Sequence, residues 1–254
     1  LGVCHNSWYR GNLEGIPSDE FSKLLPWYKK FSKNIFLHVV LPVRMNNLAQ
    51  NQKTDSLSGL SSNLPKVSLK NIFTKLLSWV SELQPLYSSG STWGSYDSMH
   101  CYQEEEVEKK QQFISEFIQN TKPKTVWDLG CNTGEYSEIA LKSGARHVIG
   151  FDYDQTSLEK AFTRADNNNL NLLPLYLDGA NPSPSQGWNN EERPGLLKRK
   201  NADAVLALAF EHHLTIGRNI PIPQFLEWLI SLAPIGVVEF IPKEDPNLQR
   251  MLSL

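Results

Sequence analysis

The segment Val126-Trp127-Asp128-Leu129-Gly130-Cys131-Asn132-Thr133-Gly134 joins a short apolar stretch to an amphipathic one. Residues 125–128 predict a buried β-strand, and residues 135–143 predict a helix with one apolar face. Glycines are needed where a ligand lies against the backbone or where φ is positive. The N-terminus of the following helix offers unpaired N–H groups to an anionic part of a ligand. The segment therefore predicts a strand, a ligand-binding glycine loop and a helix.

The chain after residue 120 repeats this alternation of short apolar and amphipathic segments. Further strands are expected at 147–152, 172–177, 202–209 and 236–240. Helical spacing of apolar residues occurs between them at Leu158, Ala161, Phe162 and Ala165, and at Ile222, Phe225, Leu226, Leu229 and Ile230. Pro221 and Pro223 suit the first turn of the second of these helices. Strands that alternate with helices are typical of an α/β fold with a parallel sheet.

The first part of the chain has a different character. Residues 1–50 are rich in aromatic side chains and hold no alternating strand pattern, and residues 51–63 are polar and predict a loop. From Ile72 to Leu83 the apolar residues follow helical spacing, which predicts a helix with one buried stripe. We therefore expect a mainly helical region over residues 1–90, serving as an acceptor cap or an interaction module, and a second domain over residues 91–254.

The residues that follow the predicted strands narrow the class of ligand that we expect. A dinucleotide-binding loop reads G-x-G-x-x-G, whereas this loop reads G-x-N-x-G from Gly130 to Gly134. Asp128 precedes the loop, Asp152 lies 22 residues beyond Gly130, and Asp178 ends the third predicted strand. Ligands of open α/β sheets bind at the carboxyl ends of the strands. These acids are therefore expected to meet in one ligand crevice.

The segment 128–134 resembles motif I of the class I S-adenosylmethionine-dependent methyltransferases, with Asn132 in place of the commoner middle glycine. The resemblance implies a Rossmann-like sheet of strand order 3-2-1-4-5 and S-adenosyl-L-methionine as cofactor. In that family the glycine loop passes beneath the methionine part, the acid after the second strand holds the ribose hydroxyls, and the acid after the third strand accepts from the adenine amino group. The cofactor-binding residues that it implies are Asp128, Gly130, Cys131, Asn132, Thr133, Gly134, Asp152, Tyr153, Asp178 and Gly179.

Two further cofactor contacts are implied by a segment that resembles the helix preceding motif I in this family. Lys110 is the candidate for a salt bridge to the cofactor carboxylate, and Tyr102 for a hydrogen bond to it. The alternative is a solvated helix face, because several glutamates surround Lys110. Gly130 is expected to tolerate no side chain, since a Cβ would enter the space of the methionine part or strain a positive φ.

A narrower resemblance links the chain to a group of bacterial class I methyltransferases often labelled nodulation-related. It is carried by residues 178–183, 187–193, 206–214 and 239–246 and covers most of the chain. A complete class I sheet has two further strands, yet 14 residues follow Phe240. Two strands and a helix need roughly 40 residues at ordinary element lengths. We therefore expect the last two strands to be missing by truncation.

The candidate catalytic residues Glu211, His212 and His213 follow the fourth predicted strand. Methyl transfer requires alignment of donor and acceptor and, for a hydroxyl acceptor, removal of a proton. Histidine suits that task because its unperturbed pKa is about 6.5. His212, being closer to the strand end, is slightly preferred over His213. Alternatively, the histidines cap a loop or pack on the sheet, and Glu211 pairs with Arg218.

A metal site and a lid are two further possibilities. Glu211 with the histidines could hold a divalent cation, as in the small-RNA 2′-O-methyltransferases, but no second ExxEH-type element is present and we expect no metal. Residues 181–200 form a connection longer than the usual ~2–6 residues of α/β units, and such loops are often lids. Trp188 and Arg193 are its candidates for closing over acceptor or donor.

Composition sets the remaining expectations. The net charge is −2 and the pI near 6.3, so no global basic footprint for nucleic acid or an anionic membrane is present, and no apolar run reaches a membrane span. Three cysteines favour a reducing compartment, hence the cytoplasm. We expect an enzyme that methylates an O or N atom of a small molecule or glycan, without a membrane partner. An RNA methyltransferase and a non-catalytic cofactor-binding interaction protein are the alternatives, and the oligomeric state is left open.

Overall fold

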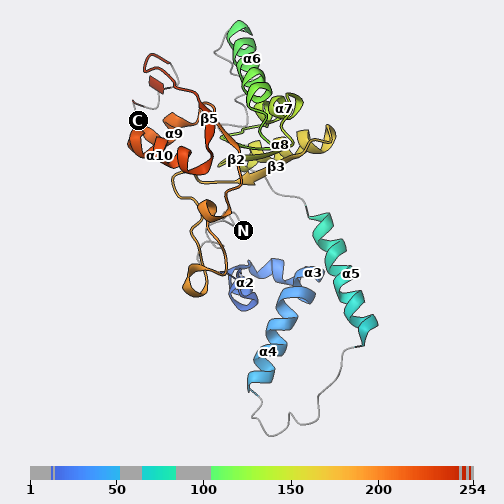
Figure 1. Cartoon of the computed structure of the whole chain (residues 1–254). Coiled ribbons are helices and arrows are strands. Elements are labelled where there is room, and N and C mark those ends of the chain that lie inside the picture. Colours follow the sequence, from blue (N-terminus) through green and yellow to red (C-terminus); the bar gives the residue numbers. More distant parts are fainter. Residues whose placement is uncertain are drawn as a thin grey trace. The chain divides into compact units, whose positions relative to one another are not determined.

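The computed structural model describes residues 13, 15–51, 65–83, 104–245, 248–249 and 252 (Figure 1). The chain divides into two compact units, an N-terminal unit of residues 1–86 and a C-terminal unit of residues 87–254, which are taken separately below. The predicted loop at 51–63 lies almost entirely outside the described residues.

The C-terminal unit is built on a five-stranded parallel sheet with the order β3-β2-β1-β4-β5, which confirms the expected strand order. Its strands are β1 (Thr125–Leu129), β2 (His147–Asp152), β3 (Leu172–Tyr176), β4 (Ala204–Ala207) and β5 (Ile235–Val238). In register, Asp128 of β1 lies between Gly150 of β2 and Leu206 of β4. All five carboxyl ends therefore meet at one edge of the sheet.

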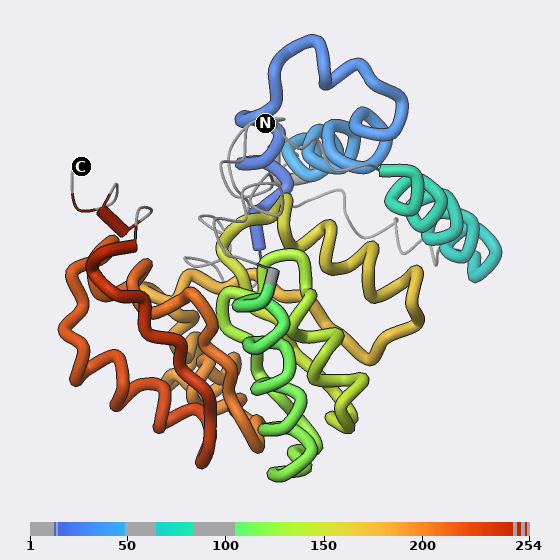
Figure 2. The backbone as a smooth tube through the Cα atoms, turned by 90° about the horizontal axis from the view of Figure 1, so that it is seen from above, coloured from blue at the N-terminus to red at the C-terminus, as the bar shows by residue number. Residues whose placement is uncertain are grey.

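Helices cover both faces of this sheet (Figures 1 and 2). On one face lie α6 (Glu104–Thr121), α7 (Glu135–Lys142) and α8 (Gln155–Asn167), whose apolar residues pack with Val126, Val148 and Leu206. On the other lie α9 (Glu211–Thr215) and α10 (Ile222–Leu232), around Trp127 and Phe151. Neighbouring residues of β1 thus enter different cores, because successive side chains of a strand point to opposite faces.

The structure differs from the prediction at the β4 and β5 side of the sheet. β4 ends at Ala207, because the backbone bends there and Ala209 has a φ of 50°. β5 is shorter than predicted, and Phe240, placed in the strand by the sequence, follows it and is 69% exposed. The apolar stripe of α10 is only partly buried: Phe225 and Leu229 enter the core, whereas Ile230 is 75% exposed.

The N-terminal unit is helical in its described part, as expected. It comprises α2 (Ser18–Leu24), η1 (Trp27–Phe31), α3 (Lys33–Ile35), η2 (Phe36–Val40), α4 (Leu41–Asn51) and α5 (Lys66–Glu82). The prediction of a buried stripe on the last helix is wrong, because no residue of α5 is buried and Phe73 and Leu77 are more than half exposed. Trp79 of α5 stacks on His38 of η2, with the ring centres 5.5 Å apart. Periodicity predicted the helix, but it could not show whether another element packs on its apolar side.

No helix among the described residues is long and apolar enough to cross a membrane.

Candidate active site

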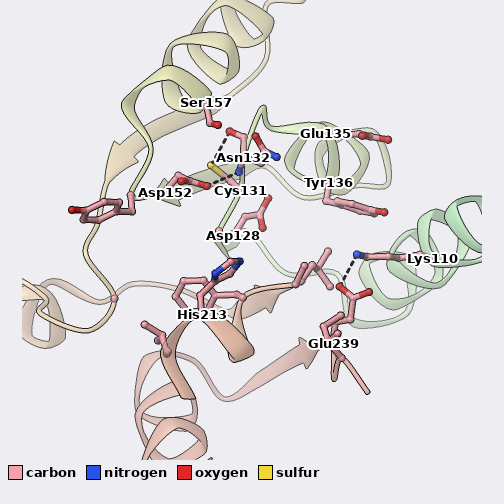
Figure 3. Close-up of a pocket in the computed structure, with 18 of the residues that line it drawn as sticks. Lys110, Asp128, Cys131, Asn132, Glu135, Tyr136, Asp152, Ser157, His213 and Glu239 are labelled. Carbon is pink, nitrogen blue, oxygen red and sulfur yellow. Dashed lines mark hydrogen bonds and ion pairs between the residues drawn. The ribbon is translucent and has the colours of Figure 1, made fainter. Parts of the chain in front are cut away.

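A cavity of about 1070 Å³ opens at the carboxyl edge of the sheet (Figure 3). Its wall is formed by residues between Glu106 and Asp245, so it lies within the C-terminal unit. Helix α6, the loops after β1, β2 and β3, helix α9 and the segment after β5 all contribute side chains. Segments that are far apart in the sequence therefore share one ligand-sized space.

The glycine loop forms one wall of this cavity. Gly130 and Asn132 have φ values of 75° and 48°, and the backbone N–H groups of Gly130 and Cys131 both donate to the carbonyl of Phe151. Asparagine is among the side chains that best tolerate a positive φ, which explains how Asn132 replaces a glycine. Gly134 does not line the cavity, and a Cβ there would come within 3.0 Å of Leu172. Its role is close packing of the loop on β3 and α8.

Asp128 lines the cavity and is 1% exposed. The Ser137 hydroxyl at the start of α7 donates to its carboxylate at 2.6 Å. Burial raises the pKa of Asp128 to about 6, and the nearby Asp152 acts in the same direction. A cationic ligand group beside Asp128 would favour its ionised form.

Asp152, at the end of β2, holds the glycine loop as well as facing the cavity. One carboxylate oxygen accepts from the Asn132 N–H at 2.9 Å and the other from the Asp154 N–H at 2.8 Å. Burial raises the pKa of Asp152, although these backbone donors oppose the rise. Each carboxylate oxygen has two lone pairs, so both oxygens can still accept from a ligand hydroxyl.

Two buried polar atoms beside Asp152 have no hydrogen-bond partner within the described part of the chain. They are the Asn132 side-chain oxygen and the hydroxyl of Ser157, both on residues of the cavity wall. Buried polar atoms are almost always paired, so an unpaired set in a cavity indicates a site completed by ligand or water. The sequence pattern did not indicate Ser157, since a serine in the first turn of a helix is ordinary. The capping Asp154, three residues before Ser157, was the available signal.

Lys110 reaches the cavity from α6, but it already has a partner. Its ammonium forms an ion pair with Glu239, just after β5, at 2.6 Å, and lies 4.7 Å from the centre of the Tyr136 ring. The Lys110 side chain is 23% exposed, so a freely solvated helix face is not what the structure shows. Tyr102 lies outside the described residues. Of the other implied cofactor residues, Tyr153, Asp178 and Gly179 line the cavity together with Cys131 and Thr133.

The two histidines occupy different environments because a helix begins at Glu211. Adjacent residues of a helix point in different directions, and His213 lines the cavity whereas Glu211 and His212 do not. Figure 3 shows the His213 imidazole directed toward Asp128. The geometry therefore reverses the slight preference for His212.

Burial lowers the pKa of both histidines. The pKa of His213 falls to about 4 through burial and the neighbouring His212, whose ring centre is 4.2 Å away. His213 is consequently neutral at pH 7. Glu211 accepts a hydrogen bond from the Thr215 hydroxyl at 2.6 Å rather than pairing with Arg218. Among the described residues, no three His, Cys, Asp or Glu side chains gather to hold a metal ion.

The predicted lid does not reach the cavity. None of residues 181–200, all of which the structure describes, lines its wall. Gln186 and Arg193 exchange backbone hydrogen bonds that close a small loop, and Trp188 at its tip is 83% exposed. The length of the segment suggested a lid, but the hydrogen bonds between Gln186 and Arg193 close the segment on itself, and none of its residues lines the cavity.

Carboxylates dominate the charge of the cavity wall. Lys109, Lys110 and Arg218 are its three basic side chains. The nine acidic ones are Glu106, Asp128, Glu135, Asp152, Asp154, Asp178, Glu239, Glu244 and Asp245. Such a cavity attracts cationic ligands and repels polyanions.

S-adenosylmethionine fits this set of groups. Its sulfonium and ammonium groups are cationic, and its ribose and adenine offer hydroxyl and amino donors. Asp128, Asp152 and Asp178 would accept these donors, and the unpaired atoms of Asn132 and Ser157 offer further hydrogen bonds. The glycine loop leaves room for a ligand against its backbone.

Comparison with known proteins agrees with this fit. Residues 104–174 match the family described as FtsJ-like methyltransferase. The nodulation protein NoeA of Rhizobium meliloti (strain 1021) is 45% identical over 252 residues, covering 99% of this chain and 53% of that protein. The ribosomal protein L11 methyltransferase of Colwellia psychrerythraea is 45% identical over 60 residues, covering 23% of this chain and 20% of that protein. The chain therefore spans about half the length of NoeA.

Solved structures are also similar to the chain. The bifunctional kinase-methyltransferase WbdD matches with a TM-score of 0.43 and 19% identity, covering 67% of this chain and 36% of that one. The methyltransferase domain of bacterial CtHen1 matches with a TM-score of 0.41 and 18% identity, covering 57% of this chain and 73% of that one. The strand order, the glycine loop with its acids and the sequence matches agree. The chain therefore has the strand order of the class I S-adenosylmethionine-dependent methyltransferases and is similar to methyltransferases in sequence, which indicates S-adenosyl-L-methionine as the methyl donor.

Proposed function

We propose that the protein transfers a methyl group from S-adenosylmethionine to an O or N atom of a small molecule or glycan. The observation that carries this proposal is the acidic cavity, with nine carboxylates against three basic side chains and one neutral histidine in its wall. Its carboxylates favour a cationic cofactor and a neutral or cationic acceptor. A polyanionic RNA would meet repulsion at the same wall.

In this proposal the cofactor supplies an electrophilic methyl group, and the chain supplies alignment and proton removal. Asp128, Asp152 and Asp178 hold the cofactor against the glycine loop. His213 accepts the proton of the acceptor hydroxyl at a ring nitrogen, since its low pKa keeps it unprotonated at neutral pH.

The proposal gives residues 1–90 the role of an acceptor cap or interaction module and residues 91–254 the role of the catalytic domain. It also places the reaction in the cytoplasm.

Burial raises the pKa of the Cys131 thiol well above its usual range, so this free cysteine stays protonated and is a poor nucleophile.

The cofactor site is tested by Asp152→Asn. A hydrogen bond to a charged group contributes roughly 1.5–3 kcal/mol, so calorimetry should show S-adenosylmethionine binding at least ~10-fold more weakly. Asp166→Asn, on the exposed side of α8, is the matched control and should bind as the wild type does. Unchanged affinity in a folded Asp152→Asn variant would contradict the assignment.

The acceptor class is tested with a methyl-labelled cofactor and bacterial extracts separated into metabolite, glycan, RNA and protein fractions. We expect label in the metabolite or glycan fraction. Label in RNA, together with affinity for RNA that falls steeply with salt, would favour an RNA methyltransferase instead. Cofactor binding without label in any fraction would favour the non-catalytic alternative.

A further inference from the structure

The overall charge of −2 conceals a strong separation of charge along the chain. The N-terminal unit, residues 1–86, holds ten Lys or Arg residues against five Asp or Glu, whereas residues 87–254 hold fifteen against 22. No acidic residue occurs from Phe21 to Thr54. The N-terminal unit is therefore a cationic module attached to an anionic domain.

The same basic segment exposes a cluster of aromatic rings on η1. Trp27, Tyr28 and Phe31 are 75%, 58% and 76% exposed. The Trp27 ring lies edge-to-face against both others, with centres 6.2 Å from Tyr28 and 6.3 Å from Phe31. Lys29 lies in the same short helix, with its ammonium 6.0 Å from the centre of the Tyr28 ring. We call these side chains, with the exposed Lys23 and Lys33 on either side, the aromatic–basic patch.

The aromatic–basic patch is not the edge of a substantial core. In the described part of the N-terminal unit, the buried apolar side chains are Leu25 and Val40 alone. Large apolar groups gathered on a surface mark interaction sites with proteins, membranes or ligands. The rings of η1 are therefore exposed among the described residues of the N-terminal unit.

We propose that the aromatic–basic patch binds the surface of a bilayer that contains anionic phospholipids. Tryptophan and tyrosine favour the level of the lipid headgroups, where an apolar ring and a polar edge are both satisfied. Lysines beside them attract the anionic surface, and the combination of inserted apolar groups with a basic cluster supports reversible peripheral binding. The expectation of no membrane partner depended on the net charge of the whole chain and on the lack of a membrane-spanning apolar run. Neither observation concerns peripheral binding by a local basic cluster.

The geometry favours a bilayer over a nucleic acid. Successive bases stack on aromatic faces that are open. Here the rings stand at 89° and 79° to Trp27, so each pair covers part of a ring face. A compact wedge of edge-to-face rings can still enter a headgroup layer. The anionic C-terminal unit is the other charge-complementary surface, and the experiment separates it from a membrane.

The test is sedimentation of the 254-residue chain with sucrose-loaded vesicles of phosphatidylcholine alone and of phosphatidylcholine with ~30% phosphatidylglycerol. We expect binding to the anionic vesicles that weakens as KCl is raised. We expect the double variant Trp27→Ala/Phe31→Ala to lower the partition coefficient at least ~10-fold, because it removes the inserted rings. The double variant Lys29→Glu/Lys33→Glu should also lower it at least ~10-fold, since each lysine near the surface contributes about fivefold. Trp188→Ala and Lys198→Glu, exposed residues of the C-terminal unit, are the matched controls and should bind as the wild type does.

The patch lies outside the cavity wall, so cofactor affinity measured on every variant should be unchanged. That readout separates this inference from the proposed function, and far-ultraviolet circular dichroism of each variant checks that the helices of the N-terminal unit are intact. Equal binding to both vesicle types, or full binding by the Trp27→Ala/Phe31→Ala variant, overturns the proposal. So does absence of vesicle binding, or preferential binding of the patch to an RNA oligonucleotide in the same assay.

Discussion

His213 is the side chain to which we assign removal of the acceptor proton. If it removes the acceptor proton, His213→Gln should lower turnover by ~10²–10⁴-fold while cofactor affinity stays the same. His212→Gln is the matched control, since that ring lies outside the cavity wall, and its effect should be much smaller. Single-turnover methyl transfer measures both. Equal rates in wild type and both variants would mean that alignment alone drives the reaction.

The low pKa of His213 also predicts the pH dependence of stability. The unfolded chain protonates this histidine near pH 6.5, whereas the folded chain does so near 4. The unfolded state therefore binds more protons in this window, and stability is lost as pH falls from 6.5 toward about 4. His213→Gln should flatten this part of the curve of unfolding free energy against pH. Denaturant titrations at several pH values check it, and a curve unchanged by the substitution would contradict the buried neutral state.

Asp128 predicts how cofactor binding depends on pH. Its pKa is raised to about 6 in the free protein, and a cationic ligand lowers it by favouring the carboxylate. Below pH 6, binding must release a proton, so affinity should fall as pH falls and stay constant above about 7. Calorimetry in buffers of different ionisation enthalpy measures the released proton. Asp128→Asn should abolish the proton release, and an unaltered release would assign it to another group.

The turn between β1 and α7 depends on its first glycine. Gly130 has a φ of 75°, and a Cβ there would lie 3.0 Å from the Phe210 ring, which is also in the cavity wall. The sequence predicted that a Cβ at Gly130 would enter the space of the methionine part or strain a positive φ. The positive φ is present, and Phe210 is a further neighbour that leaves little room for a side chain. The turn between β1 and α7 therefore depends both on the positive φ of Gly130 and on the Phe210 ring from a distant segment.

Gly130→Ala should destabilise the protein by about 1–3 kcal/mol and weaken cofactor binding, because both the strain and the shifted Phe210 act at the cavity. Gly144→Ala is the control: its φ is also positive, at 121°, but nothing lies within 4 Å of the added Cβ. It should lose stability through strain and keep its cofactor affinity. Thermal melts and calorimetry on both variants test this, and equal loss of affinity would contradict a local role for Gly130.

The whole molecule combines two units of opposite charge, and the cavity belongs to one of them. Because its wall runs from Glu106 to Asp245, residues 87–254 alone should bind S-adenosylmethionine as tightly as the full chain. Vesicle binding, by contrast, should be lost with residues 1–86. Calorimetry on the two forms decides the first point. A large loss of cofactor affinity in a folded C-terminal unit would mean that the N-terminal unit completes the site.

Much of this protein could be predicted from local pattern. The strand at 147–152, the glycine loop and the acids at 128, 152 and 178 were recognisable because each depends on neighbours along the chain. The strand order followed from the family resemblance and was confirmed. Hydrophobic periodicity also located α5, α8 and α10, since a helix repeats its faces every three to four residues.

Packing between distant segments decided the rest. Lys110 and Glu239 are 129 positions apart, and nothing in either sequence neighbourhood indicates that they pair. His213 rather than His212 faces the cavity because α9 starts at Glu211, and the exposed stripe of α5 shows that periodicity does not reveal what covers a face. Local sequence sets backbone preference and chemistry, whereas partners, burial and direction depend on which segments the tertiary fold brings together.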